Sequence, residues 1–151
     1  MTKTMDAGSE VYLGQDALDV EHQGQMLLLL ALEKELCGAA DEARLAVLLD
    51  RVIEFSNIHF MSEQVLMREH AYPGLPAHEA EHDQLMDQMR DFQKRIETGE
   101  RTLVAADLSS LRDWVLRHIR TKDTAFAHYL GIAREVRDRQ SVVLLAYPAT
   151  A

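Results

Sequence analysis

The stretch "HFMSEQVLMREHAYPGLPAHEAEH", residues 59–82, joins two segments of helical composition through a Pro-Gly turn, and four of the chain's seven histidines lie in it. Residues four apart project from the same side of an α-helix, about 6 Å apart along its axis. His59 and Glu63 therefore share one helix face before the turn, and His78 and His82 share one after it. This spacing predicts two adjacent helices that present metal-binding groups to a common interior.

Outward from this turn, apolar residues recur at three- and four-residue steps in four segments, as is typical of amphipathic helices. Gly38 follows the first segment as a C-terminal cap, and Asp41 precedes the second as an N-cap residue. The expected helices cover about residues 18–38, 41–70, 76–98 and 103–139. Short connections make neighbouring helices antiparallel, so the expected fold is all-α: an up-down-up-down four-helix bundle within a domain of residues 1–140.

The composition favours a single globular domain and argues against a nucleic-acid-binding, membrane-spanning or secreted protein. A chain of 151 residues that is 47% hydrophobic can build one domain with a core. Its formal net charge of −9 is opposite to the basic surface that nucleic-acid binding requires. No apolar run is long enough to span a bilayer, and the first residues lack the apolar stretch of a secretory signal. The single cysteine, Cys37, excludes an internal disulfide; we expect a monomeric cytoplasmic protein without membrane insertion, in which Cys37 is a small buried residue.

The last eleven residues, "SVVLLAYPATA" (141–151), do not continue the pattern of the fourth helix. Residues 142–147 are apolar and favour extended structure, and Pro148 ends the run. We expect this apolar tail to pack over an exposed groove of its own bundle. Docking to a protein partner and disorder are the alternatives.

Five histidines fall on the inward faces of the expected helices. His22 lies on the apolar stripe of the first helix and His118 on that of the fourth, and residues 59–82 supply the other three. An unpaired polar group in an apolar interior costs on the order of 1–3 kcal/mol, while a typical domain is stable by only about 5–15 kcal/mol. Metal binding is the compensation that the spacing favours, because neutral imidazole suits iron, zinc or copper. Five histidines exceed what one ion uses, so two ions bridged by carboxylates are expected.

Glu63 is one candidate bridge, and Asp123 is the other despite an irregular spacing. Asp123 follows His118 by five residues, which on a regular α-helix places the two side chains about 140° apart. A one-residue π-bulge near residues 120–122 would turn Asp123 inward, and such bulges are frequent at functional sites. On a regular helix, Asp123 would face solvent.

Taken in chain order, these residues resemble the motif of the hemerythrin family. The family pattern is one histidine on the first helix, His-x3-Glu on the second, His-x3-His on the third and His-x4-Asp on the fourth, and every element is present. The flanking sequences "LDVEHQ" around His22 and "W..RHI" around His118 agree with it, and the resemblance covers about residues 14–130. One departure is Gln64, which stands where a second glutamate is frequent and is expected to face outward.

The resemblance implies a non-haem di-iron centre in the core of the bundle. The ligands would be His78, His82 and His118 for one iron, His22 and His59 for the other, and Glu63 and Asp123 for both. An oxo or hydroxo group would complete the bridge and leave the two-histidine iron one ligand short, so dioxygen would bind there. By its family position, Leu116 would line the oxygen pocket.

The implied function is reversible dioxygen binding for storage, delivery or sensing. An imidazole-rich ligand set donates less negative charge than the carboxylate-rich set of ferritin-like di-iron enzymes, which favours carrying oxygen over activating it. The alternatives are a di-iron peroxidase or oxidase, or a scavenger of oxygen or nitric oxide. A metal reservoir, or a sensor that signals through the tail, is a third reading.

Overall fold

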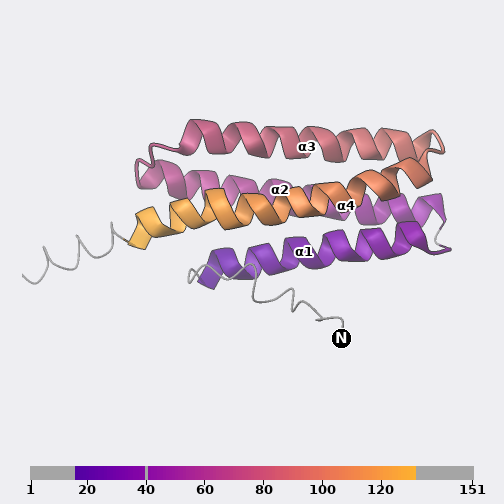
Figure 1. Cartoon of the computed structure of the whole chain (residues 1–151), viewed down its shortest axis with the longest axis horizontal. Coiled ribbons are helices and arrows are strands. Elements are labelled where there is room, and N and C mark those ends of the chain that lie inside the picture. The colour runs from indigo at the N-terminus through magenta and orange to yellow at the C-terminus, as the bar shows by residue number, and fades with distance from the viewer. Residues whose placement is uncertain (1–15, 40, 132–151) are drawn as a thin grey trace, which may run out of the picture.

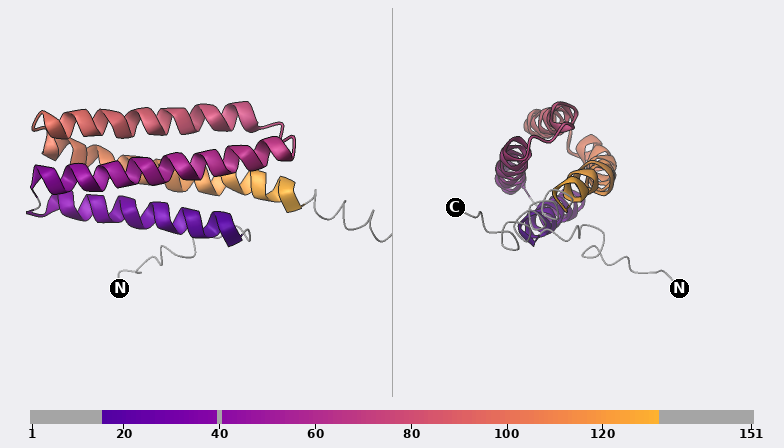
Figure 2. Two further views of the ribbon diagram at one scale, coloured as in Figure 1. Left: turned by 180° about the vertical axis from the view of Figure 1, so that it is seen from behind. Right: turned by 90° about the vertical axis from the view of Figure 1, so that its left-hand side faces the viewer.

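The computed structural model describes residues 16–39 and 41–131 of the chain, and within them the fold is all-α. The elements are α1 (Asp16–Cys37), α2 (Glu42–Glu69), α3 (Leu75–Glu97), α4 (Arg101–His118) and a π-helical turn, η1 (Ile119–Asp123), after which residues 124–131 are again α-helical. Consecutive helices run in opposite directions, and α1 packs against α4 to close the ring (Figures 1 and 2). The up-down-up-down four-helix bundle is therefore confirmed. Parts of the expected domain of residues 1–140, and the whole tail of residues 141–151, lie outside the described residues.

The helix ends follow the local signals in the sequence. Asp41 is the N-cap of α2, and its carboxylate accepts a hydrogen bond from the backbone N–H of Arg44 at 2.8 Å. Gly99, after α3, has a φ of +83°, a backbone conformation that glycine adopts without strain. In the turn between α2 and α3 the positive φ of 50° falls on Ala71. Gly74 has a negative φ and is required for space, because a Cβ there would lie 2.6 Å from the ring of Tyr72.

Two apolar clusters form the core, and they lie at different levels of the bundle. The larger cluster fills the half between the metal-competent residues and the α1–α2 and α3–α4 connections; its members include Leu29, Leu49, Met89 and Leu108. The smaller cluster, at the opposite end, consists of Leu18, Met67, Phe126 and Leu130. The histidines and acids of the expected site lie near the boundary between these two clusters, and on α3 they lie between Leu75, which packs against the smaller cluster, and Leu85 of the larger one. The polar layer therefore has apolar packing on both sides.

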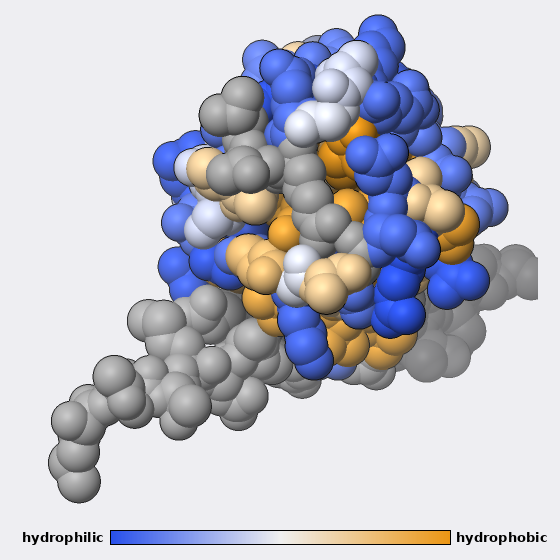
Figure 3. All heavy atoms as spheres, turned by 90° about the vertical axis from the view of Figure 1, so that its right-hand side faces the viewer, coloured by the Kyte–Doolittle hydropathy of each residue, from blue (hydrophilic) through white to orange (hydrophobic). Residues whose placement is uncertain are grey.

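The end of the bundle that carries the α1–α2 and α3–α4 connections is mostly hydrophilic at its surface (Figure 3). Figure 3 looks onto the end with the α1–α2 and α3–α4 connections and shows hydrophilic residues around most of the rim, with hydrophobic ones toward the lower edge and right side. Cys37 is exposed at the end of α1, so the expectation that it is buried was wrong. Within residues 16–39 and 41–131, no helix combines the length and apolar composition needed to cross a membrane.

Candidate metal centre

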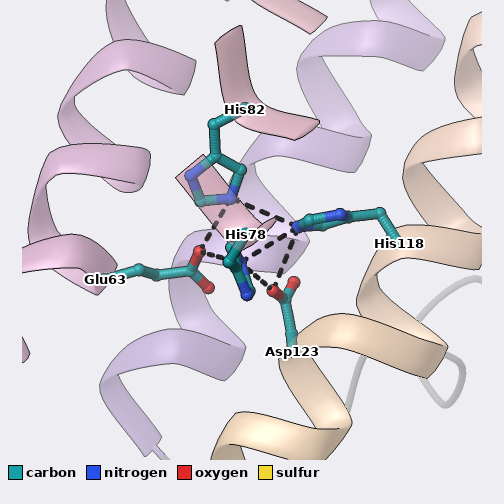
Figure 4. A group of neighbouring side chains, drawn as sticks. All are labelled: Glu63, His78, His82, His118 and Asp123. Carbon is teal, nitrogen blue, oxygen red and sulfur yellow. Dashed lines mark hydrogen bonds and ion pairs between the residues drawn. The ribbon is translucent and has the colours of Figure 1, made fainter. Parts of the chain in front are cut away.

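Seven buried side chains from all the helices converge between the two apolar clusters, and they are the seven expected from the sequence. Each is at most 4% exposed. The contributing residues are His22 on α1, His59 and Glu63 on α2, His78 and His82 on α3, His118 at the end of α4 and Asp123 at the end of η1. Figure 4 shows five of them pointing toward one another from three helices.

The π-helical turn brings Asp123 into this group. Residues 119–123 form η1, so the helix holds one residue more per turn between His118 and Asp123 than a regular α-helix would, as the spacing predicted. Asp123 is 1% exposed, and one carboxylate oxygen, Oδ1, lies 3.2 Å from His118 Nε2. The other, Oδ2, lies 2.9 Å from His22 Nε2 on the opposite side. The π turn therefore lets one carboxylate face histidines of two different helices.

The donor atoms form two overlapping groups, each with its members within 4.8 Å of one another, as the ligands of one ion would be. The first group contains Glu63, His78, His82, His118 and Asp123, and the second contains His22, His59, Glu63 and Asp123. Both carboxylates belong to both groups. The first group thus offers three imidazoles and the second offers two.

The polar contacts inside the site fit a bound cation better than a network of hydrogen bonds. The Nε2 atom of His118 lies 3.2 Å from Nε2 of both His78 and His82. Where Nδ1 carries the proton, each Nε2 presents a lone pair, and lone pairs do not bond to one another. Among the described residues, Glu63 Oε2 and both carboxylate oxygens of Asp123 are buried, and the polar atoms near them are imidazole Nε2 atoms at 2.9–3.4 Å. A metal ion satisfies converging lone pairs of this kind, so the donor set fits one.

Two glutamates outside the cluster accept hydrogen bonds from histidine Nδ1, the ring nitrogen that points away from the site. His59 Nδ1 donates to Glu21 at 2.8 Å, and His118 Nδ1 donates to Glu81 at 2.7 Å. Because a carboxylate only accepts, these bonds place the proton on Nδ1 and leave Nε2 free to bind a metal. Lys122 lies 3.3 Å from the second oxygen of Glu81 and anchors that carboxylate.

Gln64 on α2 contacts the outer nitrogen of His82, as Glu21 and Glu81 contact those of His59 and His118. The expectation that Gln64 faces outward was therefore wrong. It is partly buried, and its side-chain amide nitrogen lies 3.2 Å from His82 Nδ1. The oxygen and nitrogen of an amide exchange places by a half-turn, after which the oxygen accepts from His82 Nδ1. His82 therefore has a neutral partner where His59 and His118 have charged ones.

Aromatic rings fix the imidazoles from the sides. Phe60 stacks on His82 with ring centroids 3.9 Å apart and planes 12° from parallel. Trp114 stacks on His118 at 5.4 Å and 15°. Leu116, expected in the oxygen pocket, is partly buried and packs against the larger apolar cluster.

Burial and charge set the protonation of the metal-free site. Burial disfavours the charged form of His22 and of His78, but the carboxylates of Asp123 and Glu63 outweigh it and raise the pKa of both histidines to about 9. Burial lowers the pKa of His82, which stays neutral. Burial and mutual repulsion oppose ionisation of the two acids, yet the histidines around them keep the pKa of Glu63 and of Asp123 below the ordinary values.

These shifts predict how the stability of the metal-free protein depends on pH. A raised histidine pKa stabilises the fold below the ordinary value of 6.5, and this contribution disappears as the pH rises through about 9. The lowered carboxylate pKa values stabilise the fold above about 4.5, and that contribution disappears in acid. We expect the urea midpoint of chelator-treated protein to be highest between these limits and to fall from pH 7 to pH 10. His78→Gln should reduce the alkaline fall, and an exposed-surface substitution such as Asp113→Asn should not; a midpoint that rises with pH would contradict the assignment.

The outer partners were not predicted, although the sequence contains a signal for them. Glu21 directly precedes His22, Glu81 directly precedes His82, and Gln64 directly follows Glu63. A residue next to a ligand is rotated by about 100° around the helix, so it faces the adjacent helix. Each of the three accordingly reaches a histidine of a neighbouring helix.

Comparisons with known proteins agree with this geometry. The family model "Hemerythrin HHE cation binding domain" matches residues 13–130. A bacteriohemerythrin of Methylococcus capsulatus is 34% identical over 83 residues, which are 55% of this chain and 63% of the relative. A bacteriohemerythrin of Ralstonia nicotianae is 28% identical over 121 residues, 80% of this chain and 85% of the relative. A myohemerythrin of Sipunculus nudus is 30% identical over 78 residues, 52% of this chain and 59% of the relative.

Proposed function

The chain belongs to the hemerythrin family, and from this membership and the geometry of the buried cluster we propose that it binds dioxygen reversibly at a non-haem di-iron centre. The observation that carries the proposal is the pair of donor groups that share Glu63 and Asp123. If the two groups shared only one carboxylate, a single ion with the second carboxylate outside its ligand set would explain them equally well. Two shared carboxylates, each facing both sets of histidines, fit a bridged pair of ions.

The proposed ligands follow the two donor groups. His78, His82 and His118 would hold one iron, His22 and His59 would hold the other, and Glu63 and Asp123 would bridge them. When bound, the two irons would supply the electrons and the open coordination position that reversible dioxygen binding needs. Because the second group contributes one imidazole fewer, we place that open position on the side of His22 and His59.

The residues around the ligands limit what the site does with dioxygen. Glu21 holds the His59 ring through Nδ1 and so keeps its Nε2 directed inward. The two apolar clusters exclude water from both ends of the polar layer. Leu116 would add an apolar wall to the oxygen pocket. An interior poor in water slows proton delivery to reduced oxygen, which favours release of dioxygen over its further reduction.

The test of the proposed function measures colour and iron together. Iron per chain is determined, the protein is reduced without air, and oxygen is added and then purged. We expect two irons per chain and a visible charge-transfer band that appears with oxygen and vanishes on purging. A band that forms and never reverses would favour the oxidase or scavenger reading, and the absence of any band would count against a di-iron oxygen site.

A second test concerns the outer carboxylate Glu81. Replacing it with alanine removes the partner of His118 Nδ1, which lies at 2.7 Å, and frees the ring to rotate. We expect iron affinity, measured by competition with a chelator, to fall by about 10–100-fold, the usual effect of losing such a partner.

The matched control for Glu81→Ala is Glu79→Ala on the same helix, because Glu79 pairs with Arg68 at the surface. It should leave the affinity unchanged. Glu81→Gln keeps a hydrogen-bond acceptor and should restore most of the affinity. Equal losses in Glu79→Ala and Glu81→Ala would show that the effect is on stability and not on the orientation of His118.

A further inference from the structure

Both α1 and α2 carry exposed apolar side chains. Leu27 on α1 is 67% exposed, and Ile58 on α2 is 60% exposed. Isolated apolar residues are ordinary on a protein surface, but a contiguous group marks a contact surface. Between the two helices lies a groove of about 350 Å³, the α1–α2 groove, lined by Leu28, Arg51, Glu54, Phe55 and Ile58.

The shape of the α1–α2 groove depends on Gly24. A Cβ at this position would lie 2.6 Å from Cζ of Phe55, so only glycine lets the Phe55 ring lie against the backbone of α1. The ring then forms an apolar floor beside Leu28, and Ile58 forms one wall. The charged pair Arg51 and Glu54 also lines the groove, which leaves its centre suited to an uncharged apolar segment.

We propose that residues 142–147 of this chain, Val-Val-Leu-Leu-Ala-Tyr, occupy the α1–α2 groove. None of the eleven residues 141–151 is charged, and the six proposed to bind are apolar or aromatic. Left in water, such a run would be an aggregation site. Covering the groove with this segment removes both apolar surfaces from water at once.

The connection is long enough to reach the groove. The described part of the chain ends at residue 131, and Leu130 belongs to the same apolar cluster as Leu18 at the start of α1. Leu28 lies ten residues further along α1, about 15 Å along the helix axis. Residues 132–141 could span up to about 35 Å if extended, which covers this axial distance together with the roughly 10 Å between neighbouring helices. Val20, which is 68% exposed on α1, lies along this path.

The charge of the chain favours its own segment over a second copy as the occupant. Two copies would each bring a formal net charge of −9 to the contact, and this repulsion opposes self-association. A tethered segment meets no such repulsion between molecules, and a short tether gives it a millimolar effective concentration at the groove.

A docked segment would also lie next to one half of the metal centre. Phe55 is one helical turn before His59, and Gly24 is two residues after His22. The segment would therefore add an apolar layer outside the two-histidine side. Its effect on oxygen access, unlike the docking itself, rests on the proposed function.

The docking is tested by photo-cross-linking in the full chain, which needs no iron. Tyr147 is replaced by benzoylphenylalanine, the protein is irradiated, and the adducts are mapped by mass spectrometry. We expect adducts on the peptides that contain Leu27 and Leu28 or Phe55 and Ile58, in a product of monomer mass. The yield should not change over a hundredfold dilution, because the reaction is within one molecule.

Two charge substitutions make the result specific to the groove. Ile58→Asp should lower the yield at least severalfold, and Leu28→Asp should do the same, because both residues line the groove. Met61→Asp is the control, because Met61 is 57% exposed on the same helix and does not line the groove. Adducts elsewhere, no adduct, a product of dimer mass that grows with concentration, or an equal loss in Met61→Asp would each overturn the proposal.

Discussion

Replacing Asp123 with alanine is expected to lower the iron bound per chain from the two proposed ions to one or none. The Asp123 carboxylate lies 2.9 Å from His22 and 3.0 Å from His78, so its loss removes a ligand from both donor groups at once. The effect on affinity should exceed the 10–100-fold loss typical of an outer partner. The oxygen-dependent band should vanish with the paired ions. Iron stoichiometry after gel filtration measures the first effect, and the visible spectrum measures the second.

The control for Asp123→Ala is Asp113→Ala, which removes an acid of the same helix whose side chain is 70% exposed. It should keep two irons and the band. Far-UV circular dichroism and thermal unfolding of both metal-free variants show whether the bundle still forms. If a folded Asp123→Ala protein kept two irons, the proposed bridge would be wrong.

Replacing Phe126 with alanine is expected to lower the free energy of unfolding by about 3–5 kcal/mol, the usual cost of removing a fully buried aromatic ring. Phe126 is 0% exposed and packs against Tyr72 with ring centroids 5.0 Å apart. The loss is a large share of a typical total of about 5–15 kcal/mol. Urea unfolding of the metal-free protein measures it.

Because Phe126 lies outside both donor groups, iron binding by the folded variant is a second measurement that tests this prediction. The ring belongs to the smaller apolar cluster and to neither donor group, so the folded variant should still bind two irons. Tyr129→Phe is a milder comparison, because it removes only the hydroxyl that donates to the His70 carbonyl at 2.7 Å. It should cost on the order of 1 kcal/mol. A loss for Phe126→Ala no larger than for Tyr129→Phe would mean that this cluster contributes little to stability.

The fold and the seven polar residues of the cluster were predictable because they obey simple periodicities. Pairs four residues apart on α2 and α3 project inward together, and this regularity shows in a single sequence. The π turn was predictable for the opposite reason: a pair five residues apart, His118 and Asp123, makes sense in one core only if the helix gains a residue.

What the sequence did not reveal depends on contacts between helices. Whether Gln64 faces solvent or His82 is decided by the distance and rotation between α2 and α3, which no spacing along one helix contains. The same holds for Glu21 and Glu81, whose partners lie on neighbouring helices. The burial of Cys37 was wrongly predicted because the sequence does not show whether a residue in the last turn of a helix packs against a neighbouring helix or faces solvent.

The extra residue of η1 has a consequence for comparing chains of this kind. Deleting Lys122 would leave an aspartate four residues after His118, on the same face of an ordinary helix. Residues 124–131 would still follow that aspartate at the same spacing and so project from the same helix faces relative to it. The main loss would be the contact of Lys122 with Glu81. Two lengths of chain can thus encode one pocket, so an alignment of homologues should allow a single gap here without treating it as loss of the site.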